Sequence, residues 1–218
     1  MSRILGVCLI FLAFASCKKS TTTADKYMTF SAGSSWNYQQ NNAGSITNYT
    51  VTSTSRDSLI LGKTYHVFTN SSGANQYFNV TGNDYFQFDS IKLAGVAQSI
   101  DRLYLKEDAA INGAWSQSIS FILPGVPIPG GVPLTINNTV SEKGISRTVN
   151  GIVYTDVIHL QTTLTSTLIP AASLTSTIHT YYARKYGLIE NSTVIALNFM
   201  GFNNNVNTTT KLMSSTLH

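Results

Sequence analysis

The sequence of 218 residues is poor in cysteine and in charge, and each shortage excludes a class of protein. Of the 2 cysteines, Cys8 lies in an apolar run that we expect to be removed, which leaves Cys17 without a disulfide partner. Charged residues make up 11% of the chain, whereas about a quarter is usual. The basic residues are mostly scattered, whereas a nucleic-acid-binding protein needs a clustered basic surface. We therefore expect neither a disulfide scaffold nor a nucleic-acid partner.

The sequence also lacks helical periodicity and the common catalytic motifs. No segment of about ten residues or more has the apolar spacing of a helix. There is no Gly-x-Ser-x-Gly, no His-Glu-x-x-His and no glycine-rich phosphate loop. These absences favour a non-catalytic protein without a cofactor. The alternative is a hydrolase that acts on envelope components or glycans.

The N-terminus has the pattern of an export signal. Arg3 precedes an apolar run over 4–14, and small residues at 15–16 lead directly to Cys17. The run is too short to span a bilayer, which takes about 20 residues. The pattern resembles a bacterial lipoprotein signal, in which the cysteine is lipidated and becomes the first residue. The alternative is an ordinary signal peptide cut after Ala13-Phe14-Ala15.

The chain therefore divides into three parts. We expect residues 1–16 to be the lipoprotein signal peptide and residues 17–32 to be the lipidated Cys17 with a Ser/Thr-rich tether. Residues 33–218 are expected to form a single all-β domain. The lipid on Cys17 would attach the protein to a membrane, which predicts a location in the bacterial cell envelope.

Beyond residue 33 the chain is rich in β-branched and alternating segments that are typical of strands. The fold class that this predicts is all-β, with antiparallel meanders forming a curved sheet, a half-barrel or a sandwich. A turn is predicted at residues 203–205, which are all asparagine. Residues 123–133 contain four of the 5 prolines and are predicted to be a loop or edge. Val126, Ile128 and Val132 would make that loop either a lid over the core or an exposed contact patch.

Three short motifs resemble those of uncharacterised, all-β outer-membrane lipoproteins of the Bacteroidota type. They are Gly33-x-x-Trp36-x-Tyr38, Gly151-x-x-Tyr154-x-Asp156-Val157-Ile158 and Tyr181-Tyr182-Ala183-x-x-x-Gly187-Leu188-Ile189. The resemblance implies an outer-membrane location with a lipid anchor, and it implies no particular reaction. It also implies O-glycosylation at Asp-Ser-aliphatic tripeptides, which occur here around Ser58 and Ser90.

Aromatic residues are the main candidates for ligand contact. A groove for a glycan or an apolar ligand could be lined by five of them, although such residues more often fill a β core. The candidates are Trp36, Tyr65, Tyr77, Tyr85 and Trp115.

Histidines and carboxylates provide weaker candidates for chemistry. A hairpin centred near Ile169 would place His159 opposite His179 on one face, but a metal site needs three or four ligands, so no metal site is predicted. Asp156 and His159 are separated by an odd number of positions, which places them on opposite faces of a strand. Paired carboxylates cleave glycosides only at a fixed separation. The carboxylates considered for that role are Asp101, Glu107 and Asp108.

Overall fold

The protein was described from a computed structural model, which covers residues 25–93, 95–122 and 128–218. The described residues form twelve β-strands and no helix. The strands are β1 (Ser35–Asn42), β2 (Ser45–Ile60), β3 (Lys63–Asn70), β4 (Gln76–Thr81), β5 (Asp84–Leu93), β6 (Val96–Lys106), β7 (Ala114–Phe121), β8 (Val132–Val149), β9 (Ile152–Thr165), β10 (Leu174–Ala183), β11 (Gly187–Phe199) and β12 (Phe202–Thr216).

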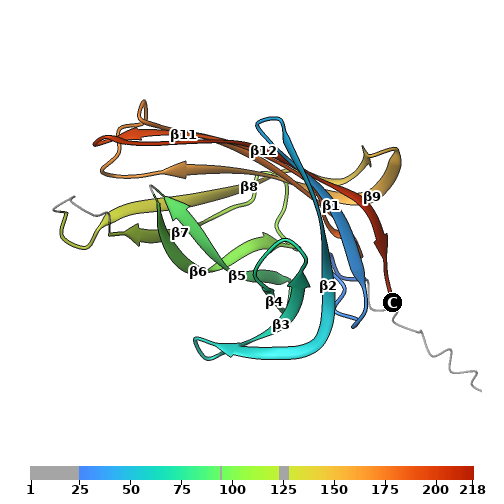
Figure 1. The fold of residues 1–218 in the computed structure, drawn as a ribbon. Coiled ribbons are helices and arrows are strands. Elements are labelled where there is room, and N and C mark those ends of the chain that lie inside the picture. Colours follow the sequence, from blue (N-terminus) through green and yellow to red (C-terminus); the bar gives the residue numbers. More distant parts are fainter. Residues whose placement is uncertain (1–24, 94, 123–127) are drawn as a thin grey trace, which may run out of the picture.

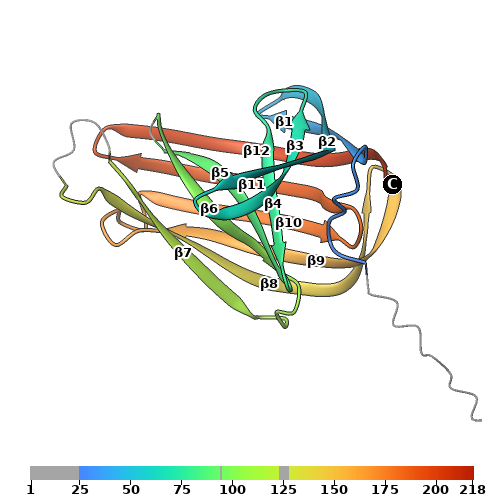
Figure 2. The ribbon, with the colours of Figure 1, turned by 90° about the horizontal axis from the view of Figure 1, so that it is seen from below.

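All twelve strands belong to one antiparallel sheet that curls into a nearly closed, barrel-shaped layer (Figures 1 and 2). The strand order is β6-β5-β4-β3-β2-β1-β12-β11-β10-β9-β8-β7. Strands that are consecutive in sequence therefore pair, except β6 and β7, and β1 pairs with β12. The predicted all-β, antiparallel fold class is confirmed, in the form of a single curved sheet.

Two-residue turns connect several of the hairpins, and each has glycine in its second position. Both central residues have positive φ, as in the type I′ turns that suit the twist of paired strands. These turns are Ala43-Gly44, Leu61-Gly62, Asn150-Gly151 and Met200-Gly201. The turn predicted at residues 203–205 is therefore wrong, because the chain reverses at Met200-Gly201 and the three asparagines lie within β12. Glycine at the positive-φ position outweighs the turn preference of asparagine.

The core lies on the inner face of the sheet. In β8, alternate residues from Val132 to Val140 are buried, as the period of two requires. One cluster surrounds Trp36 and Phe68, and a second surrounds Phe121 and Leu134 near the opposite end of the strands. The inner face is thus apolar at both ends of the sheet.

The two edges of the sheet, β6 and β7, meet through side chains instead of a backbone ladder. The indole N–H of Trp115 donates to the carbonyl oxygen of Leu103 over 2.9 Å. The side-chain amide of Gln117 accepts from the backbone N–H of Leu103 over 2.7 Å and donates to the carbonyl oxygen of Asp101 over 2.9 Å. These bonds satisfy edge groups that would otherwise be free to pair with another chain.

Residues 25–32, which the sequence places in the tether, pack against one end of the sheet. Tyr27 is buried, and Met28 and Phe30 contact the core cluster around Trp36. The packed part of the chain therefore begins upstream of Gly33. Cys17 and the rest of residues 1–24 lie outside the described residues.

The proline-rich segment is described only in part. Residues 123–127, including Val126, lie outside the described residues. Val132 is buried, and Ile128 is packed against the second core cluster. Pro133, predicted to lie in the loop, belongs to β8 opposite Ser120. The described part of this segment therefore contributes to the core.

Candidate ligand-binding cavity

The inner face of the sheet encloses a cavity of about 380 Å³. Small-molecule sites usually measure about 300–1,000 Å³, so this cavity lies at the lower end of that range. Its apolar walls are both aromatic and aliphatic, and the aromatic residues come from five different strands and the segment after β10. The aromatic lining residues are Trp36, Tyr38, Tyr49, Phe78, Tyr104, Tyr182 and Tyr186.

Small polar residues at inward positions explain why the interior is not filled. A row of Thr180, Asn191 and Thr210 crosses β10, β11 and β12 in register. Asn191 donates to the hydroxyl of Thr180 over 2.9 Å and accepts from the hydroxyl of Thr193 over 2.9 Å. Because Thr180, Asn191 and Thr193 bond to one another, their polar groups can lie in the interior without a large loss of stability.

Three cavity-lining residues each carry a buried N–H donor that has no acceptor among the described residues. They are Nε1 of Trp36, Nδ2 of Asn138 and Nε of Arg102. Trp36 is 1% exposed and Asn138 is 5% exposed, so solvent reaches neither side chain freely. An unsatisfied buried donor costs about 1–3 kcal/mol. These three donors are therefore buried and unpaired within the walls of the cavity.

A network of charges holds the N-terminal segment across one end of the cavity. The hydroxyl of Tyr27 donates to Asp156 over 2.9 Å, and Arg184 forms an ion pair with the same carboxylate. Arg184 also donates to Glu107 over 2.9 Å, and the hydroxyl of Tyr85 donates to Glu107 over 2.6 Å. Asp156 has a φ of 52°, a left-handed conformation that aspartate tolerates better than most residues.

The protonation of this network follows from its hydrogen bonds. Burial acts to raise the pKa of Glu107, but the bonds from Tyr85 and Arg184 outweigh it and hold that pKa below its ordinary value. For Asp156, bonds from Arg184 and Tyr27 overcome burial in the same way, and its pKa is also lowered. Burial raises the pKa of Tyr27 and Tyr85, and their acidic partners raise it further. At neutral pH the carboxylates are charged and the phenols are neutral donors.

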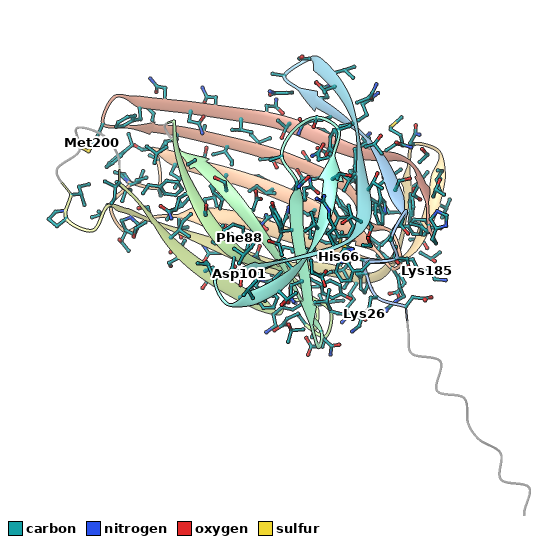
Figure 3. All side chains as sticks on the ribbon, turned by 60° about the horizontal axis from the view of Figure 1, so that its bottom comes forward. Lys26, His66, Phe88, Asp101, Lys185 and Met200 are labelled. Carbon is teal, nitrogen blue, oxygen red and sulfur yellow. The ribbon has the colours of Figure 1, made fainter. Side chains whose placement is uncertain are left out.

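The five predicted contact aromatics are not brought together in one groove. Trp36 lines the cavity, whereas Tyr85 belongs to the charged network and Trp115 to the β6–β7 contact. Tyr65 is buried against Phe88, and Tyr77 pairs with Phe88 in the sheet. Figure 3 places Phe88 and Asp101 together in this region.

The sequence did not identify the other cavity residues, because a pattern that predicts burial does not show which buried side chains face an open space. Tyr38 is two positions after Trp36 on the same strand, and the sequence does predict that the two share a face. Tyr104 and Tyr182 contact each other with ring centroids 5.3 Å apart, although they are distant in sequence. A run of inward Thr and Asn in otherwise apolar positions is the signal that could have indicated the cavity.

The two candidate histidines lie on the outer face of β9 and β10. His159 pairs with Tyr181, and His179 pairs with Gln161, so the predicted pairing of the histidines is wrong by two residues. A shift of two keeps both on one face, and Nε2 of His159 lies 2.9 Å from Nδ1 of His179. Burial lowers the pKa of His159 despite its bond to Glu142.

The ring nitrogens that face each other in this histidine pair are occupied by their mutual bond. Within the part of the chain that the structure describes, no three His, Cys, Asp or Glu side chains gather as metal ligands would. His159 also stacks on the ring of Tyr181 at 4.2 Å. The geometry is that of a packed surface cluster.

A chain of Ser53, His66 and Asp57 was not anticipated from the sequence. Oγ of Ser53 lies 3.0 Å from Nε2 of His66, and Nδ1 of His66 lies 2.9 Å from the Asp57 carboxylate. This order matches a nucleophile, base and acid. However, Ser53 is 1% exposed and its hydroxyl donates to the carbonyl oxygen of Phe30. The serine is therefore enclosed by the N-terminal segment and cannot approach a substrate.

The remaining candidates lie apart from the cavity. Asp101 pairs with Lys63, Glu107 with Arg184, and Asp108 is exposed beyond β6. Ser90 is exposed on β5 and Ser58 is half-buried on β2. Both serines lie on strands, so an attached glycan would have to project away from the surface of the sheet.

Comparison with known proteins finds structures that are only remotely similar to this chain. No protein-family model and no curated protein matches the chain. A Parabacteroides distasonis protein, provisionally described as a lipoprotein, has a TM-score of 0.47 at 11% identity over 88% of this chain and 99% of its own. A Bacteroides fragilis protein, provisionally described as exported with a YmcC-like fold, has a TM-score of 0.42 at 8% identity over the same shares. Because both TM-scores are below 0.5, nothing is transferred from either protein to this chain.

Proposed function

We propose that this protein is a non-catalytic, lipid-anchored protein of the bacterial outer membrane that binds a small, largely apolar ligand inside its sheet. The observation that supports ligand binding is the cavity of about 380 Å³ with aromatic walls. A sheet built only for stability would fill this space, because protein interiors are close-packed. The charged groups that could serve catalysis are paired with one another or lie outside the cavity.

The proposed location depends on the N-terminal sequence. Arg3, the apolar run and Cys17 together have the pattern of a lipoprotein signal. The described residues contain no helix of the length and apolarity needed to cross a membrane. A lipid on Cys17 would therefore supply the attachment, at about 0.8 kcal/mol for each buried methylene.

Filling the cavity should abolish ligand binding. Ile178→Trp enlarges a half-buried lining side chain on β10. We expect it to weaken binding of the neutral apolar fluorophore N-phenyl-1-naphthylamine at least about tenfold, because the added indole occupies the ligand's space. The measurement is a fluorescence titration of the purified protein without its signal peptide.

The matched control is Thr177→Trp, which adds the same indole one position away on an exposed site of β10. It should bind the fluorophore like the unmodified protein. Circular dichroism melts of both variants establish that each is folded. Equal binding by a folded Ile178→Trp variant would show that the fluorophore binds elsewhere, and the proposed cavity function would be wrong.

Removing the lipidation site should release the protein from membranes. Cys17→Ala leaves no acceptor for the lipid, so we expect the protein to be absent from the membrane fraction or to remain unprocessed. Fractionation of cells and a high-salt wash measure this, with mass spectrometry of the N-terminus. A correctly processed Cys17→Ala protein that still sediments with washed membranes would contradict the anchor.

The hydrolase alternative is favoured by one observation, the Ser53-His66-Asp57 chain. Its serine is enclosed, and Phe30 covers the histidine ring at 5.3 Å between ring centroids. An acyl-transfer site needs an open position beside the nucleophile and donors for the developing oxyanion. We therefore propose that the Ser53-His66-Asp57 hydrogen-bonded triad is structural and holds the N-terminal segment on β2 and β3.

A further inference from the structure

The polar side chains that line the cavity are uncharged, with a single exception. Among the described residues of the lining there is no Asp, Glu, Lys or His, and Arg102 is the one cation. The other polar groups are the amides of Asn and Gln, the hydroxyls of Thr and Tyr and the indole of Trp36. The chemistry of Arg102 therefore decides whether the cavity offers a charge to a ligand.

Arg102 does not supply a free positive charge. Its Nη2 donates to the side-chain oxygen of Gln87 over 2.7 Å and lies 3.6 Å from the carboxylate of Asp89. Asp89 is outside the lining, and its negative charge compensates that of the guanidinium. The pair thus adds no net charge to which an anionic group of a ligand could bind.

The phenols in the walls are neutral as well. Burial raises the pKa of Tyr38 and Tyr104 well above the ordinary value, and it raises the pKa of Tyr182 to about 12. The hydroxyl of Tyr38 donates to the carbonyl oxygen of Leu188 over 2.9 Å. At neutral pH the walls therefore carry no phenolate to which a cationic ligand could bind.

The charged network that holds the N-terminal segment contributes no side chain to the lining. Its members Arg184, Glu107 and Asp156 are paired with one another. Lining residues that solvent partly reaches include Ile178 and Ile195, which are apolar. Neither the interior of the cavity nor these half-exposed positions therefore provide a counter-charge for an ionised ligand.

We infer that the ligand is an uncharged, lipid-like molecule and that the cavity discriminates against ionised amphiphiles of the same chain length. This inference rests on the proposed cavity function and names its ligand class. An ionised head inside the cavity would lose its hydration without gaining a partner of opposite charge, which is strongly unfavourable. A head that stays hydrated outside leaves less of the alkyl chain in contact with the apolar walls.

The test compares four probes that share one alkyl chain: 1-decanol, methyl decanoate, decanoate and decylammonium. Each competes with N-phenyl-1-naphthylamine for the purified protein at pH 8, where the carboxylate and the ammonium are both ionised, below the concentration at which the probe forms micelles. We expect 1-decanol to displace the fluorophore at about tenfold lower concentration than either ionised probe, which corresponds to about 1.4 kcal/mol. Methyl decanoate, the neutral ester of decanoate, should compete like 1-decanol.

A variant that adds the missing counter-charge connects this preference to the cavity. Ile195→Lys places an ammonium at a half-exposed lining position of β11. We expect it to improve competition by decanoate about tenfold relative to 1-decanol, because the ammonium attracts the carboxylate. Val194→Lys, at the neighbouring exposed position outside the lining, is the matched control and should preserve the order of the unmodified protein. Circular dichroism melts establish that both variants are folded.

The outcomes separate the inference from the proposed function. If the fluorophore binds but an ionised probe competes as well as 1-decanol, or methyl decanoate competes no better than decanoate, the exclusion of charge is wrong and cavity binding stands. If neither the fluorophore nor any probe binds, both fall. If folded Ile195→Lys and Val194→Lys treat decanoate alike, the missing counter-charge is not the cause and the inference is overturned. The ester and its carboxylate, compared on the unmodified protein, decide the ligand class even if Ile195→Lys does not fold.

Discussion

Replacing Arg184 with glutamine should lower the free energy of unfolding by about 2 kcal/mol at pH 7. Breaking a fully buried ion pair costs about 3–5 kcal/mol, and the expected loss is smaller because the Arg184 side chain retains 25% exposure. The substitution leaves Glu107 and Asp156 without the cation between them. Urea denaturation followed by tryptophan fluorescence measures the change.

The loss should depend on pH with a definite sign. Folding lowers the pKa of Glu107 and Asp156, so their contribution to stability is complete above the ordinary carboxylate range and disappears as the pH falls through their lower folded values. The difference between the unmodified protein and Arg184→Gln should therefore be largest near pH 7 and shrink below about pH 4. A difference that is constant from pH 7 to pH 3 would show that lost packing, and not charge pairing, is responsible.

The neighbouring residue provides a control for charge alone. Lys185 carries the same charge at the next position, and its pair with Asp25 is 57% exposed on both sides. Exposed ion pairs contribute little to stability. Lys185→Gln should therefore leave the urea midpoint nearly unchanged at every pH.

Removing the ring of Tyr27 should destabilise the protein by about 3 kcal/mol, as truncation of other large buried aromatic residues does. Tyr27 is 1% exposed, contacts Tyr85 edge to face and lies under the guanidinium of Arg184. Tyr27→Ala should lower the melting temperature by roughly 6–12 °C for a domain of this size. A melting temperature within error of the unmodified protein would show that residues 25–32 are not part of the folded unit.

A conservative variant separates the hydroxyl of Tyr27 from its ring. Tyr27→Phe keeps the contacts with Tyr85 and Arg184 but loses the bond to Asp156. Hydrogen bonds to charged groups contribute about 1.5–3 kcal/mol, and the partial exposure of Asp156 places this one at the lower end. Thermal melts of the two variants, side by side, should therefore rank Tyr27→Ala below Tyr27→Phe and both below the unmodified protein.

The N-terminal segment connects the proposed lipid anchor on Cys17 to the folded sheet. Only nine residues separate Cys17 from Tyr27, so a lipid on Cys17 would hold the Lys185 end of the sheet near the membrane. The opposite end of the sheet, at Met200, would then point away from the membrane. The Cys17→Ala experiment tests the proposed anchor on which this arrangement depends.

The fold class could be read from the sequence because its signal is local. Alternation with a period of two needs only neighbouring residues, and it predicted the shared face of Trp36 and Tyr38 and the ends of β4 and β9. It also predicted that Asp156 and His159 would not bond to each other; Asp156 bonds to Arg184 and His159 to Glu142. The strong preference for turns at asparagine misled the prediction at residues 203–205, where a positive-φ glycine nearby decided the turn.

Local sequence patterns therefore specify the all-β class, the inward or outward face of many strand residues and the export pattern before Cys17. The tertiary structure alone decided the closure of the sheet, because Trp115 and Gln117 reach backbone groups of β6 that no periodicity identifies. It also decided the cavity and its unpartnered donors. Arg102, Asn138 and Trp36 come from β6, β8 and β1, and only the register of twelve strands brings side chains so distant in sequence to one enclosed space.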